Sequence, residues 1–203
     1  MAKHQYAIDA NGPKRIEVSW SGFWKNTTVK FDGNVIGTFP GQKELRQGGS
    51  FQLPDGSTIN VQLIMGLYTE LRVLRNGQPL PGSTSDPQTR FKAAYGIVFF
   101  IAGLNLVLGL LSLTTESNFL RSIGIGTPSI VFGLIFLGLG FVIRQQRSKM
   151  ALILAIVIFG LDMILGFVLN ASGGGSPSTT GIIPRIFLFI PMVQGVSAID
   201  QLS

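Results

Sequence analysis

Hydrophobic and polar residues follow different patterns in the two halves of the chain. Through residue 80, short runs alternate apolar and polar residues between Gly-rich turns, which is the period-2 pattern of half-buried β-strands. After residue 90, four long blocks are almost continuously apolar. This pattern predicts a small all-β domain at 1–80 (an antiparallel sandwich or open barrel), a linker at 81–90 and an all-α four-helix transmembrane bundle at 91–203.

Three turn signals divide the β domain into hairpins. Asp32-Gly33, Asp55-Gly56 and Asn76-Gly77 each stand between two strand-like runs. Such pairs favour tight hairpin turns, because Gly, Asn and Asp tolerate positive φ better than other residues. We therefore expect an antiparallel meander, preceded by a polar N-terminal tail that holds the only histidine, His4.

The four apolar blocks have the length of membrane spans, for which about 20 residues cross roughly 30 Å of hydrocarbon. The predicted spans are 93–115, 124–143, 150–170 and 182–200. Thr127 and Pro128 are typical of an N-cap followed by the first helical residue, and Pro184 is predicted to open the fourth span in the same way. Pro191 lies inside that span and predicts a kink.

The distribution of Lys and Arg predicts the orientation of the spans, because cytoplasmic loops carry an excess of both. Five of these residues lie beside one set of span ends and two beside the other. The bias predicts a multi-pass protein of the cell (inner) membrane, with both termini cytoplasmic and the loops 116–127 and 171–181 outside. The five are Arg90, Lys92, Arg144, Arg147 and Lys149, and the two are Arg121 and Arg185.

The first and third spans share a motif. Gly103-Leu-Asn105-Leu-Val-Leu-Gly109 aligns without a gap on Gly160-Leu-Asp162-Met-Ile-Leu-Gly166. This alignment predicts an internal repeat, a duplicated helical hairpin, with chance similarity of Gly- and Leu-rich helices as the alternative. Small residues let helices approach closely in lipid, so Gly103, Gly109, Gly160 and Gly166 are predicted packing positions. The same offset superposes Gly124-Ile125 on Gly181-Ile182 and Gly138 on Gly195.

Asp162 is the one carboxylate deep within a predicted span. A charge there costs at least about 2.5–3.5 kcal/mol, so we expect it to face the bundle with a partner. The candidate partners are Asn105, Gln194 and Arg185. A packing contact between helices is the favoured interpretation. The alternative is an ion- or proton-binding carboxylate in a small transporter or channel subunit.

Trp20, Phe23 and Trp24 form an aromatic cluster within the β domain. Aromatic side chains contribute large apolar areas to small cores, and a core role is the favoured interpretation. A ligand-binding or surface-contact platform is the alternative.

Composition excludes several classes of site. The chain has no cysteine and one histidine, so we expect no disulfide, no thiol nucleophile, no metal site and no cofactor. The net charge of +6 is spread evenly over both halves, which does not predict nucleic-acid binding. No Walker, Rossmann, nucleophile-elbow, kinase or metalloprotease motif is present, so we do not expect an enzyme.

Three segments, Val29–Gly33, Gly48–Leu53 and Leu71–Leu80, resemble the β-sandwich of the Fas apoptotic inhibitory molecule family. The whole chain also resembles four-span bacterial membrane proteins with an N-terminal β domain. Neither resemblance implies a catalytic residue, and the first implies a sandwich for protein–protein contact. We expect a non-enzymatic membrane protein whose cytoplasmic β domain binds a protein partner or the membrane surface. The helices then have the lipid bilayer as their partner, and a homo-oligomer is left open.

Overall fold

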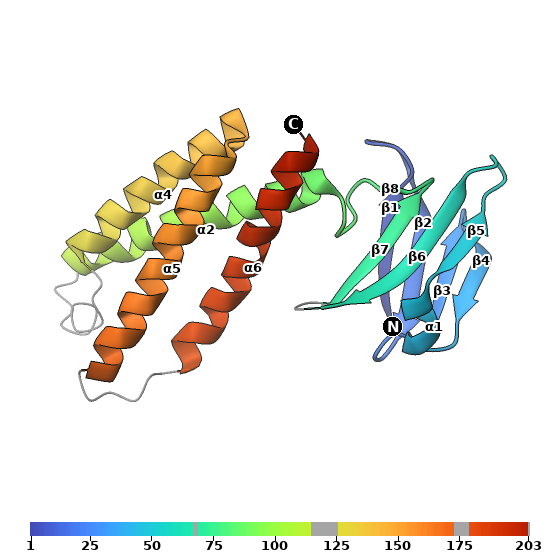
Figure 1. Cartoon of the computed structure of the whole chain (residues 1–203), viewed down its shortest axis with the longest axis horizontal. Coiled ribbons are helices and arrows are strands. Elements are labelled where there is room, and N and C mark those ends of the chain that lie inside the picture. Colours follow the sequence, from blue (N-terminus) through green and yellow to red (C-terminus); the bar gives the residue numbers. More distant parts are fainter. Residues whose placement is uncertain (67–68, 115–125, 173–178, 203) are drawn as a thin grey trace. The chain divides into compact units, whose positions relative to one another are not determined.

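The computed structural model describes residues 1–66, 69–114, 126–172 and 179–202, without the side chains at 166–167, 169–172 and 179–183. The chain divides into two compact units, Met1–Thr89 and Arg90–Ser203 (Figure 1). Each unit has its own hydrophobic core. Most of the predicted outer loops 116–127 and 171–181, with Arg121 and the repeat pair at 124–125, lies outside the described residues.

The first unit contains two antiparallel four-stranded sheets. One has the order β1 (Ala2–Ala7), β2 (Lys14–Ser21), β3 (Lys25–Phe31), β4 (Asn34–Phe39), and the other β5 (Gly49–Gln52), β6 (Thr58–Met65), β7 (Thr69–Arg75), β8 (Gln78–Pro79). A short helix, α1 (Gln42–Gln47), lies between β4 and β5 in the chain. Side chains from both sheets share one core, so the predicted antiparallel β domain is confirmed, in the form of a sandwich.

Alternation along the strands builds this core. Ile16 and Val18 on β2 and Ile59, Val61 and Leu63 on β6 are fully buried, whereas the residues between them are more exposed. Successive side chains of a strand point to opposite faces, so one face of each sheet packs inward and the other meets solvent.

All three predicted hairpin turns are present. Asp32 and Gly33 have φ values of 48° and 83°, and Asn76 and Gly77 have 48° and 82°. Two successive positive φ values match the mirror-image turn that suits the twist of antiparallel strands. Gly56, in the third turn, has φ of 81°.

Two elements of the sandwich differ from the sequence-based expectation. Residues 2–7, expected as a polar tail, form the edge strand β1, which pairs with β2. The strand has one well-buried apolar residue, Tyr6, so its alternation is hard to recognise. The six-residue helix α1 is likewise short and buries only Leu45.

The segment that joins the sandwich to the first long helix is fixed by hydrogen bonds. The Thr84 hydroxyl donates to the Leu71 carbonyl oxygen at 3.1 Å, and Ser83 and Ser85 are buried. Asp86 accepts from the backbone N–H of Gln88 at 3.0 Å and from the Thr89 hydroxyl at 2.8 Å. These contacts cap the helix that follows, so the predicted linker at 81–90 is packed up to the start of that helix.

Four long helices form the second unit: α2 (Pro87–Thr114), α4 (Thr127–Gln146), α5 (Lys149–Ser172) and α6 (Thr179–Leu202). Within the described residues, α2 and α4 are long and apolar enough to cross a membrane. Only 28% and 22% of their most apolar windows are buried inside the protein, unlike the core helices of a soluble fold. Phe136, Ile143, Leu152 and Met192 are the largest fully buried side chains among those described in this unit.

The two expected proline starts differ from the structure. The N-cap of α4 is Gly126, so Thr127 is the first helical residue and Pro128 the second. Helix α6 begins at Thr179, and Pro184 therefore lies inside it together with Pro191. A proline removes one backbone hydrogen bond from a helix. Prolines are nevertheless more frequent in membrane-spanning helices than in the helices of soluble proteins.

Gly37 on β4 provides a test of the sandwich packing. A Cβ at this position would collide with the ring of Phe51, whereas a Cβ at Gly66 meets no atom within 4 Å. We expect Gly37→Ala to lower the free energy of unfolding by about 1–3 kcal/mol through overpacking. The control substitution Gly66→Ala is expected to be nearly neutral. Urea unfolding followed by tryptophan fluorescence measures both, because both tryptophans of the chain, Trp20 and Trp24, lie in the sandwich. Equal unfolding midpoints for the two variants would contradict this packing.

Candidate functional site

Asp162 on α5 forms an ion pair with Arg185 on α6. Arg185 Nη1 lies 3.3 Å from Asp162 Oδ2, and the side chains are 40% and 44% exposed. Arg185 is one of the three predicted partners. The pair compensates a carboxylate that the sequence places within an apolar helix, and it links α5 to α6.

The other two predicted partners have different contacts. The side-chain amide of Asn105 donates to the Ile101 carbonyl oxygen of its own helix at 2.9 Å. Gln194 is half-buried on α6, and its backbone carbonyl oxygen accepts from the Ser197 hydroxyl at 2.9 Å. The structure therefore brings Asp162 together with Arg185, while the Asn105 amide bonds within α2.

The four predicted packing glycines have unequal surroundings. A Cβ at Gly109 on α2 would lie 2.6 Å from Ile130 Cγ1 on α4, so this glycine permits a close helix contact. A Cβ at Gly160 would make an ordinary contact with Phe189 at 3.8 Å, and one at Gly103 would meet no atom within 4 Å. Gly103 is therefore open among the described residues, and the packing role predicted for it stays a prediction; Gly166 is outside the described side chains.

Three other glycines also lie at close contacts between helices. A Cβ at Gly133 would lie 2.8 Å from Leu106 Cγ, and one at Gly140 would lie 2.9 Å from the Phe99 ring. At Gly195 on α6, a Cβ would collide with Ala94 of α2. Gly133 and Gly140 are two helical turns apart and therefore share one face of α4. Their seven-residue spacing is visible in the sequence and is a signal from which this contact face could be predicted.

The aromatic cluster of the β domain separates into buried and exposed members. Trp20 lies in the core, and Trp24 stacks on it with ring centroids 4.3 Å apart and an interplanar angle of 19°. Phe23, between them in sequence, is 88% exposed. Trp24 has φ of 60°, a left-handed conformation that costs energy for a bulky residue and is enriched at functional positions.

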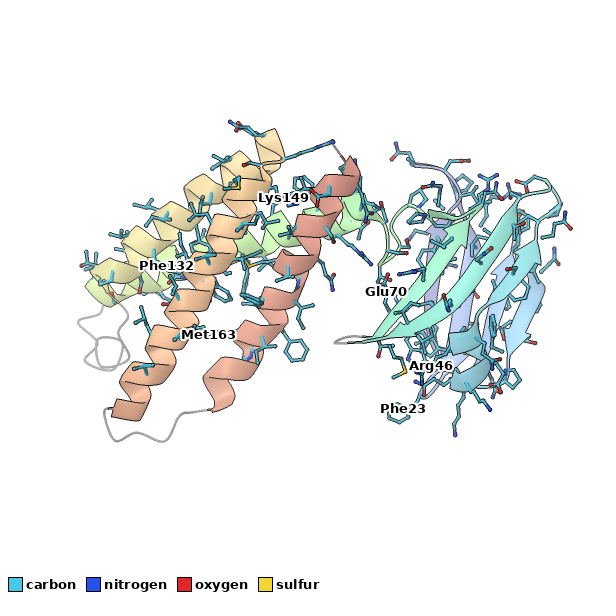
Figure 2. The ribbon with its side chains drawn as sticks, in the orientation of Figure 1. Phe23, Arg46, Glu70, Phe132, Lys149 and Met163 are labelled. Atoms are coloured by element: carbon cyan, nitrogen blue, oxygen red, sulfur yellow. The ribbon has the colours of Figure 1, made fainter. Side chains whose placement is uncertain are left out.

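The turn that carries Phe23 lies at one end of the sandwich with two other elements. The backbone N–H of Asn26 donates to the Pro40 carbonyl oxygen at 3.1 Å, which joins the turn to the end of β4. The side chain of Gln42 at the start of α1 donates to the Met65 sulfur at the end of β6 at 3.5 Å. We call this region the Phe23 end; Figure 2 labels two of its residues, Phe23 and Arg46.

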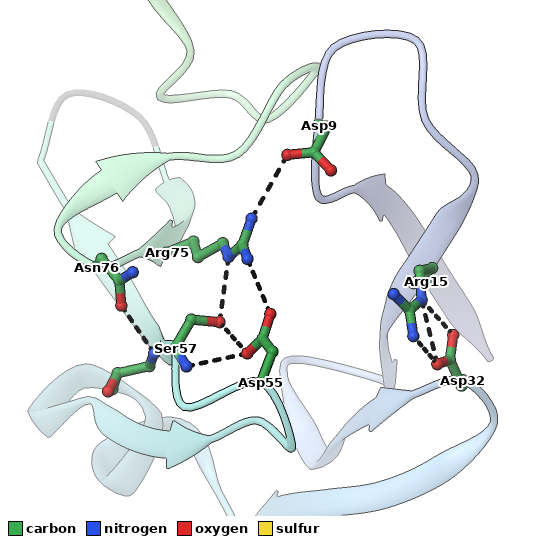
Figure 3. Close-up of polar contacts among 8 residues, drawn as sticks. Asp9, Arg15, Asp32, Asp55, Ser57, Arg75 and Asn76 are labelled. Carbon is green, nitrogen blue, oxygen red and sulfur yellow. Dashed lines mark hydrogen bonds and ion pairs between the residues drawn. The ribbon is translucent and has the colours of Figure 1, made fainter.

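Polar contacts dominate the opposite end, which we call the Arg75 end (Figure 3). The Arg75 guanidinium donates to Asp55 at 2.8 Å and to the Ser57 hydroxyl at 3.1 Å, and it lies 3.5 Å from Asp9. Arg15 on β2 pairs with Asp32 in the β3–β4 turn. These contacts fasten turns of both sheets, which is a structural role.

Hydrogen bonds and cations hold two carboxyl groups of the Arg75 end in the ionised form. The hydrogen bonds and positive charge of Arg15 lower the pKa of Asp32. The hydroxyl and the backbone N–H of Ser57, with a smaller effect of Arg75, lower the pKa of Asp55. Within the described residues, no group of three His, Cys, Asp or Glu side chains is placed to hold a metal ion.

No protein family matches the chain, and no curated protein or solved structure matches it significantly.

The lowered pKa of Asp32 predicts that acid weakens the sandwich. Because the carboxyl group has a lower pKa in the folded than in the unfolded chain, its stabilisation is present above the unfolded pKa of about 4 and is lost as pH falls further. Asp32→Asn keeps a residue that tolerates positive φ but cannot titrate. We expect the urea midpoint, followed by tryptophan fluorescence, to fall less below about pH 4 in this variant. Parallel pH curves for variant and parent would contradict the assigned ion pair.

The Asp162–Arg185 pair predicts non-additive effects on the helical unit. Asp162→Leu or Arg185→Leu alone leaves one charge without its partner, and each is expected to lower stability by about 1–2 kcal/mol. The double Leu variant removes both charges and is expected to lose less than the sum of the two. Asp162→Asn retains a hydrogen-bonding group and serves as the control, with little effect. Thermal unfolding in detergent, followed by helical circular dichroism, measures all four; additive losses would contradict a direct pair.

Proposed function

We propose that the chain is a non-enzymatic multi-pass membrane protein in which four helices hold the β sandwich at the cytoplasmic face as a binding module. The observation that carries this proposal is the low burial of the helices. Large apolar side chains are exposed on all four of them, and soluble monomers rarely expose such extensive apolar surface. The exposed set includes Phe100, Val107, Leu134, Phe141, Leu154, Ile164, Leu165 and Phe187.

Lengths support the proposal of four spans. Helices α5 and α6 each contain 24 residues. At 1.5 Å per residue, each is about 36 Å long, which exceeds the roughly 30 Å of hydrocarbon in a bilayer. With α2 and α4, they would give four spans. The simplest arrangement of four spans is a compact bundle in which successive helices run in opposite directions.

Contacts at one end of the helical unit support the proposed orientation. Lys149, at the start of α5, pairs with Asp200 near the end of α6 at 2.7 Å. Arg147 donates to the Leu202 carbonyl oxygen at 3.0 Å. The basic turn between α4 and α5 and the C-terminal end of α6 thus lie together, as expected if both are cytoplasmic.

The ion pair of Asp162 favours a packing role over transport. Arg185 already compensates the carboxylate, so the pair supplies the contact between helices that the position requires. A small transporter or channel subunit would need this carboxylate to exchange an ion or a proton. We therefore favour the binding module over the transporter or channel subunit. The duplicated helical hairpin and a homo-oligomer stay predictions within this proposal.

Reporter fusions test the proposed topology. We expect a reporter after Ser203 and one inserted near Lys149 to be active in the cytoplasm, and one near Gly174 to be active outside, because of the five-to-two Lys and Arg bias. An exterior signal at Lys149 would overturn the orientation. Extraction of the full chain from membranes with alkaline carbonate provides the second readout, and release into the soluble fraction would overturn the membrane proposal itself.

A further inference from the structure

The two ends of the sandwich differ in chemistry. At the Phe23 end, Phe23 and Met65 are 88% and 46% exposed. Around them stand the exposed bases Lys25, Lys43 and Arg46, with one exposed carboxylate, Glu44, on α1. An exposed aromatic tip beside excess positive charge is the combination that suits an anionic lipid surface.

The Arg75 end has a different balance. Its carboxylates Asp9, Asp32 and Asp55 pair with Arg15 and Arg75. Negative charge there compensates positive charge, and the guanidinium groups are engaged in the fold. Attraction to an anionic surface is therefore concentrated at the Phe23 end.

After β8, the segment Leu80–Thr84 runs back along β7. The backbone N–H of Leu80 donates to the Val73 carbonyl oxygen at 3.1 Å, and the Thr84 hydroxyl then donates to the Leu71 carbonyl oxygen at 3.1 Å. Along β7, these contacts step toward Thr69, which pairs with Met65.

The turn that carries Phe23 is held in place by its neighbours. Trp24 stacks on the buried Trp20, and the Ser21 hydroxyl donates to the Lys25 carbonyl oxygen at 3.0 Å across the turn. The exposed ring is thus presented by a structured turn, so little ordering is required when it meets a surface.

We propose that the Phe23 end of the sandwich binds the anionic headgroups of the membrane that holds the helices, with Phe23 inserted among the lipids and Lys25, Lys43 and Arg46 at the phosphates. The proposal rests on the proposed membrane function. A tethered surface meets lipid at high effective concentration, so modest individual contacts are sufficient for docking. This tether favours lipid over a protein partner as the occupant.

Tryptophan quenching in vesicles tests the proposal, because both tryptophans of the chain lie in the sandwich next to Phe23. The full chain is reconstituted into phosphatidylcholine vesicles with or without phosphatidylglycerol, both containing phosphatidylcholine brominated near the headgroup. We expect strong quenching with phosphatidylglycerol, weaker quenching without it, and a progressive loss of quenching as salt is added. Equal quenching in both vesicle types would overturn the charge-dependent docking.

Matched variants separate the two ends. Phe23→Asp is expected to reduce quenching in the anionic vesicles to the level of the uncharged ones. Val35→Asp is the control, because Val35 is 57% exposed at the β3–β4 turn of the Arg75 end, and it should leave quenching unchanged. Lys43→Glu and Lys14→Glu form a second pair, of which only the first should weaken quenching. Equal effects within either pair would overturn the assignment of the docking surface.

Two further outcomes distinguish this inference from the proposed function. Absence of quenching in anionic vesicles, with the chain retained after carbonate washing, would overturn lipid docking and leave the membrane proposal intact. A protein that co-purifies with the chain from membranes and is lost in Phe23→Asp, while quenching is unchanged, would replace lipid with a protein partner. Unchanged urea midpoints in all four variants are required, and they are expected because these side chains are exposed.

Discussion

The packing of the four long helices leaves much of their apolar surface uncovered. This exposed apolar surface determines which surroundings suit the helices and which contacts can hold them together. In water, exposed side chains such as Phe100, Leu165 and Phe187 would favour association, because apolar area is expelled from water at roughly 25 cal/mol per Å². In lipid, the same surface is compatible with its surroundings. Association between the helices must then come from close contacts, such as those at Gly133, Gly140 and Gly195, and from the ion pair of Asp162.

The sandwich, by contrast, buries its apolar side chains between its two sheets. Its core is continuous across both sheets, and tight turns with positive φ set the strand register. Polar ties such as Arg75–Asp55 then fasten the turns at one end. Under the proposed membrane function, the chain therefore combines two units that are stabilised by different physical effects. Each can be altered by substitutions, such as those at Gly37 and Asp162, that leave the core of the other unit untouched.

The sequence was informative where local chemistry decides the structure. Asp-Gly and Asn-Gly pairs predicted the three hairpins because backbone sterics at those positions do not depend on distant residues. Strand β1 and helix α1 were not predicted, since each is short and buries one well-covered apolar residue. Of the predicted packing glycines with described side chains, Gly109 lies at a contact too close for a Cβ and Gly103 and Gly160 do not, because which helix face meets a neighbour depends on tertiary packing. The sequence predicts three candidate partners for Asp162. Only the three-dimensional contacts distinguish Arg185, which pairs with it, from Asn105, whose amide bonds within its own helix. For the same reason, the outward position of Phe23 was not separable from the buried position of Trp20.

The contacts of Lys149 and Arg147 with the end of α6 have a consequence for biosynthesis. Lys149 and Asp200 are 51 residues apart, so their ion pair can form only after the last helix has been synthesised. Until then, the turn between α4 and α5 carries its positive charges without this carboxylate. Under the proposed topology, that interval is when an excess of positive charge retains the turn in the cytoplasm during insertion. Arrival of α6 then neutralises part of the charge and joins the last helix to the hairpin already in place.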